Sequence, residues 1–462
     1  MVPLSVVIFF FLLLRIPFND KLFNIDELIA PAVLTGMIQR GDLNGNWIVA
    51  VDIPDMFRTN QFNFYSYHLF SRPFFDPDAY TFIHNLRWVN VFLQAATLLF
   101  LLAYASRMGL ARKYQATLAV FFVVSPAMVF DTHIARSECF LYLIFAVQLW
   151  STQLKISAYW RFAIFGLLLG IGCASKITYI LTGAILLPEI VALLRSDTRR
   201  LLGQMVVMAL AALLGFVATA PYVLIDFQGF LAGVKFLFNQ YGTEHPPHSY
   251  LEPSLSRNIE RTLLFVVLTT GALLPLALFQ SVRRPVIAPG LAIFGVMMIA
   301  YFATKPVFFE RNIGIAFLSL LIFVAVNLKG RIEVSLMAAS CALMFYWSFT
   351  IGWIFGNANT HEVRFERAHF GIPVGRGWPI EGLDAFLQKC EGVFGVMDFN
   401  DDYSRKMIEE AKAKPIAHFV SVFAILPTST MHTYLESDVH YYMCAKPSSG
   451  HRPESVTVPG KD

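Results

Sequence analysis

Two adjacent acidic residues, Asp26 and Glu27, follow the first apolar stretch of the chain, which runs from Val2 to Phe18. A carboxylate at the edge of a partly dry cavity has a raised pKa and can take a proton from an incoming hydroxyl or amine. The pattern therefore predicts a catalytic base at Asp26, with Glu27 beside it. The same pair could instead stabilise the start of an interfacial helix from Leu28 to Val33, where acidic side chains are favoured.

A second group of charged residues, His133, Arg136 and Glu138, opens a later apolar segment. Charged side chains at such a depth usually pair with one another or line a polar cavity. Glu138 could assist Asp26 or bind an acceptor molecule, whereas a structural pair with Arg136 would explain the same residues. His133 fits the membrane interface and is included as a candidate for substrate binding.

Three more charged residues occur where apolar sequence breaks or begins. Lys176 has apolar sequence on both sides, so it needs an acidic partner or an anion such as phosphate, unless its side chain reaches the interface. Glu310 and Arg311 lead into a late apolar segment. The planar guanidinium of Arg311 suits phosphate or carboxylate, although a cluster of charges at a helix end would give the same pattern.

Two further polar segments carry binding candidates. The aromatic stretch 62–70, which includes Tyr65, suits either the membrane interface or stacking on a sugar ring. The segment 226–260 is expected to be a flexible loop that covers the substrate. It holds His245 and His248, but no carboxylate or cysteine spacing supports a metal site there, so neither a metal nor another cofactor is predicted.

The composition indicates the class of protein that must position these residues. Of 462 residues, 56% are hydrophobic and 15% are charged, against about 25% charged in an average soluble domain. The chain is therefore predicted to be a polytopic membrane protein. It has no continuous basic stripe and no nucleic-acid-binding motif, so nucleic acid is not expected as a partner.

No C-x-x-C pair supports a zinc or redox motif. Cys390 and Cys444 could form a disulfide in an oxidising compartment.

Apolar segments of about 17–25 residues predict about eleven transmembrane helices. The first is interpreted as an uncleaved anchor, because it lacks a basic start and a clear cleavage site. The stretch 160–194 is divided into two helices that meet near Lys176. If the N-terminus lies inside, each short inner turn carries at least two basic residues, as the positive-inside rule requires. The predicted segments are about 2–18, 84–105, 114–131, 134–154, 160–176, 177–194, 201–224, 261–281, 287–303, 312–328 and 333–355.

This alternation places the large polar segments on the outer face. They include the loop 19–83, which is predicted to contain an interfacial helix, and the tail 357–462. In the tail, apolar strands near 392–399 and 417–426 alternate with helical segments, which indicates a small α/β unit. The expected fold is an all-α polytopic membrane module, residues 1–356, followed by a soluble α/β domain outside the membrane.

Several short motifs together resemble the GT-C glycosyltransferases, nearest to the protein O-mannosyltransferases and the lipid A aminoarabinose transferases. The motifs occur in one order and on one predicted face, and the resemblance covers roughly residues 1–355. The tail does not resemble the β-trefoil domains of O-mannosyltransferases, and the Trp-Trp-Asp signature of oligosaccharyltransferases is absent. The motifs are Asp26-Glu27, Ser125-Pro126, His133-Ile134-Ala135-Arg136-Ser137-Glu138, Gly166 to Gly172 followed by Ser175-Lys176, and Phe309-Glu310-Arg311-Asn312.

The resemblance implies a sugar donor linked to polyprenyl phosphate, and glycosyl transfer at the outer leaflet with a GT-C-like architecture. Asp26 would be the general base, and Lys176 and Arg311 would hold the donor phosphate. Glu138 stands where the family commonly has Asp. Fixed cations serve a phosphate leaving group, so no divalent metal is expected. The acceptor, which is a lipid, a glycan or a protein, stays open.

Two other functions are weighed against this one. A transporter or flippase of a lipid-linked or anionic substrate would place charges near the bilayer midplane and show related halves, and the sequence shows neither. A scaffold that binds partners through its tail would not need Asp26. A bacterial inner membrane, with the site facing the periplasm or exterior, is favoured over an endoplasmic-reticulum membrane because the chain is compact and shows no retention signal.

Overall fold

The structure is a computed structural model, and it describes residues 4–17, 29–45, 65–77, 79–242, 254–283, 285–306, 310–349, 390–391 and 446–447. Most of the described residues are helical. The N-terminal helices are α1 (Leu4–Arg15), α2 (Ile29–Arg40), α3 (Tyr65–Ser71), η3 (Arg72–Phe74), α4 (Ala79–Arg107), α5 (Arg112–Val124), α6 (Pro126–Thr132), α7 (Glu138–Thr152), α8 (Ala158–Ser175) and η4 (Ile177–Leu186). The C-terminal helices are α9 (Leu187–Ser196), α10 (Thr198–Thr219), α11 (Tyr222–Ile225), α12 (Phe227–Gly242), α13 (Leu255–Thr270), α14 (Leu273–Arg283), α15 (Pro289–Ala303), η5 (Glu310–Ile313), α16 (Gly314–Asn327) and α17 (Arg331–Phe349).

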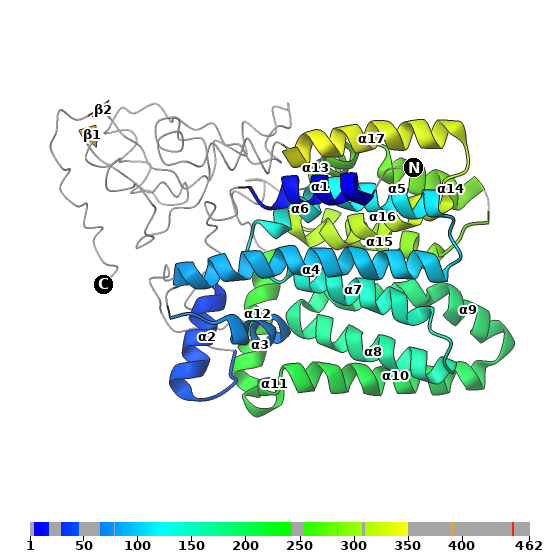
Figure 1. Cartoon of the computed structure of the whole chain (residues 1–462). Coiled ribbons are helices and arrows are strands. Elements are labelled where there is room, and N and C mark those ends of the chain that lie inside the picture. The colour runs from blue at the N-terminus through cyan, green and yellow to red at the C-terminus, as the bar shows by residue number, and fades with distance from the viewer. Residues whose placement is uncertain are drawn as a thin grey trace.

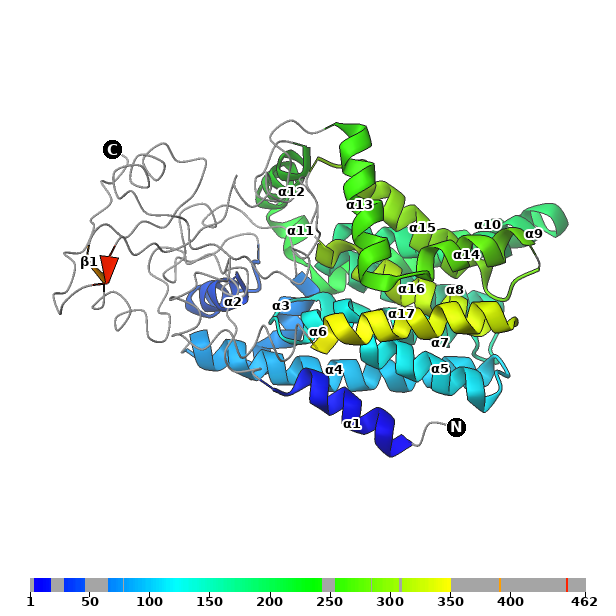
Figure 2. The ribbon, with the colours of Figure 1, turned by 90° about the horizontal axis from the view of Figure 1, so that it is seen from above.

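The long helices run side by side as a layered bundle (Figure 1). From α10 at one edge, the layers pass through α8, α7 and α4 to a group formed by α15, α16 and α5, and α17 lies at the opposite edge. The pairs α8–α10, α4–α7 and α15–α16 are in direct contact. The shorter helices α2, α3, α11 and α12 gather at one end of the bundle, whereas α9 lies at the other end (Figures 1 and 2).

The helices account for the predicted membrane spans. Among the described residues, five helices are long and apolar enough to cross a membrane, and two bent pairs bring the number to seven if each pair is one span. Four shorter apolar helices occur besides these. Each apolar segment predicted from the sequence overlaps one of these helices or pairs. The chain is therefore an integral, multi-pass membrane protein, and the eleven crossings stay a prediction.

The segment predicted as one helix over 114–131 is broken into α5 and α6, which differ in direction by 53°. The break falls at Pro126, whose ring leaves no N–H to continue the helical hydrogen bonds. The freed carbonyls need other donors in an apolar interior. The guanidinium of Arg15, at the end of α1, donates to the carbonyls of Val123 at 3.0 Å and Phe122 at 3.2 Å.

A second predicted helix, over 261–281, is also broken. Helices α13 and α14 differ in direction by 96°. Gly271 ends α13 with φ at 61°, a left-handed conformation that favours glycine. The N–H of Ala272 donates to the hydroxyl of Ser340 at 2.9 Å, so a neighbouring helix satisfies the backbone at the turn. Hydropathy alone does not reveal this turn, because apolar residues continue on both sides of it.

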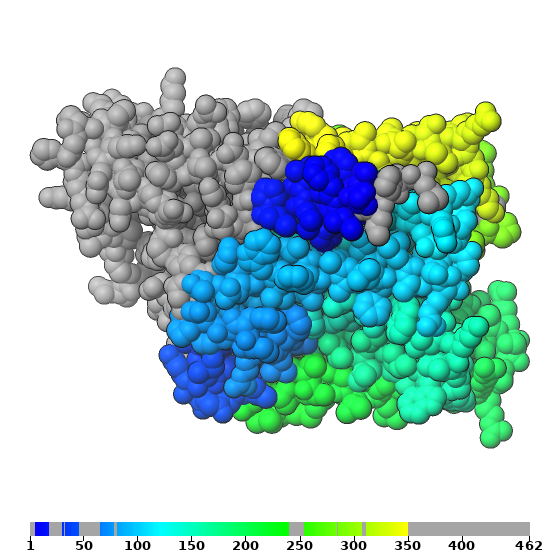
Figure 3. Space-filling view, viewed as in Figure 1, coloured from blue at the N-terminus to red at the C-terminus, as the bar shows by residue number. Residues whose placement is uncertain are grey.

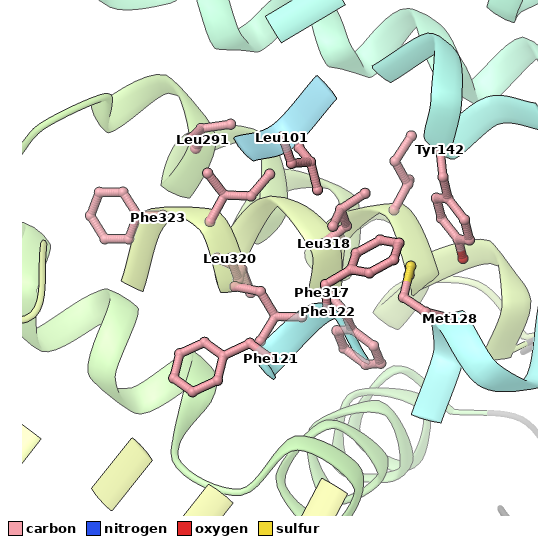
Figure 4. Close-up of a cluster of buried hydrophobic side chains, with 14 of the residues drawn as sticks. Leu101, Phe121, Phe122, Met128, Tyr142, Leu291, Phe317, Leu318, Leu320 and Phe323 are labelled. Atoms are coloured by element: carbon pink, nitrogen blue, oxygen red, sulfur yellow. The ribbon is translucent and has the colours of Figure 1, made fainter. Parts of the chain in front are cut away.

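Helix α16 forms the centre of the core. Every residue from Gly314 to Asn327 is buried, which fits a helix that is apolar on all sides. Side chains from α4, α5, α6, α7 and α15 surround it (Figure 4). On the outside of the same half of the bundle, α1 and α17 lie side by side at the surface (Figure 3). The rings of Phe10 and Phe345 meet edge to face between these two helices, with 5.5 Å between their centroids.

Helices α8 and α10 pack backbone against backbone. A Cβ atom at Gly166 would overlap the carbonyl of Met208, and one at Gly170 would overlap the carbonyl of Ala212. Small residues four positions apart allow membrane helices to approach closely. The glycine spacing of α8 therefore explains its close packing on α10, which leaves the outer side of α10 exposed.

A helix, α2, occurs where the interfacial helix was predicted, and it is longer than expected, whereas its location at the membrane interface stays a prediction. The predicted flexible loop over 226–260 is wrong in part, because α12 occupies 227–242 and α13 begins at Leu255. Asp226 caps α12, since its Oδ1 accepts the N–H of Gly229 at 3.0 Å. Its Oδ2 accepts Nδ2 of Asn44, which follows α2, at 3.1 Å. This bond connects two polar segments that are 182 residues apart.

The tail contributes two short described strands. β1 (Cys390–Glu391) pairs antiparallel with β2 (Lys446–Pro447). Cys444 and the rest of the predicted α/β domain lie outside the described residues, so both that domain and the disulfide stay predictions. The described cysteines Cys139, Cys173 and Cys341 are free thiols.

Candidate active site

An ion pair joins two of the residues predicted from the sequence. Nζ of Lys176 donates to Oε1 of Glu138 at 3.2 Å. Glu138 is the first residue of α7, and Lys176 is an extended residue between α8 and η4. The N–H of Lys176 caps α8 on the carbonyl of Gly172 at 2.8 Å, so the helix break itself sets the position of the lysine. The predicted break is confirmed, and the lysine has an acidic partner.

Two arginines add their charge to this pair. Arg136 lies on the short connection between α6 and α7 and is buried, and Arg311 belongs to η5. The charges of Lys176, Arg136 and Arg311 all act on the Glu138 carboxylate. Four residues predicted from three sequence segments thus come together in the fold. We call these four residues, together with Asp131, the charge cluster.

Asp131 is a member of the cluster that the sequence analysis missed. It lies near the end of α6, is 5% exposed, and accepts a short hydrogen bond from the hydroxyl of Tyr142. Its carboxylate interacts electrostatically with Glu138, Lys176 and Arg136. The signal in the sequence was an acidic residue at the very end of the predicted apolar segment 114–131. Within the described residues, the cluster holds three cations and two acids.

Polar atoms without protein partners adjoin the ion pair. Within the described part of the chain, Oε2 of Glu138 and the hydroxyls of Ser137 and Ser175 are buried and have no hydrogen-bond partner. Buried polar groups in folded proteins are nearly always satisfied. Ser137 precedes Glu138 and Ser175 precedes Lys176, so both hydroxyls belong to residues next to the ion pair in the chain.

His133 occupies a different environment from the charge cluster. Its ring is 2% exposed, and Nε2 lies 3.1 Å from the carbonyl of Leu14. The pKa of His133 is lowered from 6.5 to about 4, chiefly by burial and to a smaller extent by the charges of Arg87 and Arg15, while the hydrogen bond to Leu14 acts in the opposite direction. The imidazole is therefore neutral and donates from Nε2. This contact explains His133 as a link between α1 and the connection that carries Arg136.

Tyr65 is also buried, at the start of α3. Its ring packs in a small apolar cluster with Ala174 and Ala220, close to the end of α8. Burial, aided by the negative charge of Asp226, raises the pKa of the Tyr65 phenol well above its ordinary value. The ring therefore stays neutral and helps to hold α3 against α8.

The remaining candidate site residues lie outside the described part of the chain, or only their backbone is described. Asp26 and Glu27 lie outside the described residues, so their predicted roles are untested. For Glu310 only the backbone is described, as the first residue of η5. Within the described ranges no group of three or more His, Cys, Asp or Glu side chains could hold a metal ion. His245 and His248 fall outside those ranges.

The fold was compared with known proteins. The chain aligns with the crystal structure of ArnT from Cupriavidus metallidurans bound to undecaprenyl phosphate, with a TM-score of 0.53 and 14% identity. The chain shares the fold of ArnT. The apo structure of ArnT gives a TM-score of 0.51 and 15% identity, and each alignment covers 80% of this chain and 70% of the ArnT chain. No family model and no curated protein sequence matches the chain.

This likeness confirms an ArnT-like helical fold for the chain. At 14–15% identity the likeness to ArnT concerns the fold alone. The charge cluster therefore has to be interpreted from its own geometry.

Proposed function

We propose that the protein is a membrane glycosyltransferase that moves a sugar from a polyprenyl-phosphate-linked donor to a lipid, glycan or protein acceptor. The observation that carries this proposal is the charge cluster in a chain with the fold of ArnT, which was solved with undecaprenyl phosphate. The positive charges of Arg136, Lys176 and Arg311 would attract the phosphate of the donor. The hydroxyls of Ser137 and Ser175, which have no partner among the described residues, could add hydrogen bonds to the donor.

The proposed chemistry assigns one role to each group. Asp26, with Glu27 beside it, takes the proton from the acceptor hydroxyl or amine as that group attacks the anomeric carbon. The bond between the anomeric carbon and the phosphate oxygen breaks, and the electron pair leaves with the phosphate. Lys176 and Arg311 stabilise the charge that develops on the leaving group, which is where fixed positive charge lowers a barrier most. No divalent metal is part of this scheme.

Glu138 has a supporting role in this scheme. Its Oε1 holds Lys176, and its Oε2 stays available for a hydrogen bond from a sugar or acceptor hydroxyl. Because Glu138 is buried among cations, it is suited to orient and partly neutralise the site rather than to remove a proton. His133 and Tyr65 are assigned to the walls that support the site, and Glu310 is kept as a candidate ligand.

The proposed location and topology follow the sequence. We place eleven crossings in the module 1–356, with the charge cluster on the outer face of a bacterial inner membrane. The loop 19–83 and the α/β tail 357–462 would lie on the same side. Asn44 and Asp226 support part of this arrangement, because their bond fastens the loop after α2 to the start of α12 at one end of the bundle.

The test uses the purified full-length protein in lipid nanodiscs. A panel of polyprenyl-phosphate sugars is supplied with membrane extract as acceptor, and donor consumption is measured. The wild type should consume one donor, whereas Asp26→Asn should lose at least about a hundredfold in rate while it stays folded. Asp197→Asn is the matched control, because Asp197 is an exposed helix cap that Asn replaces well.

The outcomes separate the proposed enzyme from its rival. Donor consumption that is lost in Asp26→Asn and kept in Asp197→Asn supports the transferase. Full activity in Asp26→Asn overturns the assignment of the base. If the wild type moves a labelled lipid-linked sugar across the bilayer without consuming it, the transporter or flippase takes the place of the transferase.

A further inference from the structure

A buried hydrogen bond lies next to the proposed phosphate site and has no role in the chemistry above. The hydroxyl of Tyr142 on α7 donates to Oδ2 of Asp131 on α6. Tyr142 is 1% exposed and Asp131 is 5% exposed. A buried carboxylate is costly unless hydrogen bonds and opposite charges stabilise it. Asp131 therefore depends on both the Tyr142 hydroxyl and the neighbouring cations.

The pair is in contact with the first residue of α16. A Cβ atom at Gly314 would overlap the Tyr142 hydroxyl and would lie 3.4 Å from Oδ2 of Asp131. Only glycine leaves room for this approach. Gly314 directly follows η5, the turn that carries Arg311. The position of the pair thus limits where η5 can lie.

Asp131 and Arg311 also line the same small cavity. Its other walls include Phe130, Phe265 and Phe317, which are apolar. The pair and the turn that carries Arg311 are therefore neighbours at two places, at Gly314 and along the wall of this cavity.

We propose that Asp131 and Tyr142 are positioning residues, which fix the η5 turn and thereby hold Arg311 toward the phosphate of the lipid-linked donor. The identity of that ligand rests on the proposed function, whereas the placement of η5 does not. The pair acts through Arg311 and does not itself touch the reacting atoms. Its loss should therefore weaken phosphate binding only when Arg311 is present.

The first experiment tests the placement without any ligand. Hydrogen–deuterium exchange is followed for a peptide covering residues 310–316 in Tyr142→Phe and in the wild type. Exchange in this peptide should become faster in Tyr142→Phe. The matched control is Tyr179→Phe, because Tyr179 is equally buried and its hydroxyl donates to Oε1 of Gln148 at 3.0 Å. That variant should lose stability without faster exchange at 310–316.

The second experiment tests the consequence for binding. Affinity for undecaprenyl phosphate is measured in nanodiscs for Tyr142→Phe, Arg311→Gln and the double variant. Tyr142→Phe should weaken binding about tenfold, the scale of a lost hydrogen bond to a charged group. In the Arg311→Gln background the same change should have no further effect, because groups that act through one another are not additive. Tyr179→Phe should leave affinity unchanged in both backgrounds.

The two experiments fail in different ways. Unchanged exchange at 310–316 in Tyr142→Phe overturns the positioning role, whatever the ligand is. Additive effects of Tyr142→Phe and Arg311→Gln on binding overturn it as well. If exchange becomes faster but the wild type does not bind undecaprenyl phosphate, the placement of η5 stands and the proposed function fails.

Discussion

Helix α8 belongs to two regions of different physical character. In its middle, Gly166 and Gly170 bring its backbone against α10, and no charge is involved. At its end, Lys176 leaves the helix and pairs with Glu138 in the charge cluster. The first region is held together by close packing of small residues, and the second by charges that compensate one another inside the protein.

The difference teaches which changes should affect stability and which should affect chemistry. Packing between backbones tolerates no added volume, but it offers no group that a substrate could use. The cluster contains groups that can bind an anion, and its ion pair contributes less to stability because removing charges from water costs free energy. Changes in the charge cluster should therefore lower turnover, whereas changes in the packed region should lower stability and leave turnover unchanged.

The largest effect is expected for Lys176→Met. Without its ammonium, the proposed site loses a cation that stabilises the leaving phosphate, so donor turnover should fall about a hundredfold or more. The bundle should still fold, although Glu138 loses its partner and the melting temperature should drop. Donor consumption and thermal melting in nanodiscs measure both effects.

The control for this variant is Lys155→Met, since Lys155 is an exposed lysine on the connection between α7 and α8. It should keep wild-type turnover. Wild-type turnover in Lys176→Met would show that the charge cluster has only a structural role. The proposed difference in function between the cluster and the packed region of α8 would then be wrong.

A smaller effect, of the opposite kind, is expected for Gly170→Ala. The added Cβ overlaps the carbonyl of Ala212, so α8 and α10 must separate, which should cost about 1–3 kcal/mol of stability. The folded fraction should retain wild-type turnover per molecule. Gly183→Ala is the matched control, because no atom lies within 4 Å of the Cβ it would add. Equal stability of the two variants would contradict the packing argument.

The sequence predicted several of these features for physical reasons that are local. Lys176 interrupts an apolar stretch, and a charge there requires a helix break and a partner. The glycines of α8 entered the sequence analysis only as part of a motif, and their close packing on α10 is seen in the structure. The residues Arg136, Glu138 and Arg311 were selected because each opens an apolar segment. All of these signals need only the residue and its immediate neighbours.

The features that were missed depend on contacts between distant segments. Nothing near Lys176 in sequence identifies Glu138 as its partner. Nothing near Asp131 in sequence indicates that Tyr142 and Gly314 surround it. Hydropathy likewise does not separate the buried α16 from the largely exposed α10. Asp26 and the tail domain lie outside the described residues, so those predictions still depend on sequence alone.

The smallest effect concerns His133, which lies at the polar end of the bundle but outside the charge cluster. Its pKa is lowered from 6.5 to about 4 in the folded protein. Between these two values the unfolded chain binds a proton that the folded protein does not, so stability is complete above about pH 6.5 and falls as the pH drops toward 4. His133→Gln should flatten this part of the profile, because the amide can still donate to the carbonyl of Leu14 and does not titrate.

Melting temperatures of the wild type and His133→Gln, measured in parallel from pH 8 to about pH 4, isolate this contribution from all other titrating groups. Turnover at pH 7 should be the same in both proteins, since the ring is neutral there and serves only to tie α1 to the connection before Glu138. If the two melting profiles fall in parallel, the imidazole is not kept neutral by its burial. If His133→Gln loses donor turnover while it keeps its stability, His133 takes part in substrate binding, and the purely structural role assigned to it is wrong.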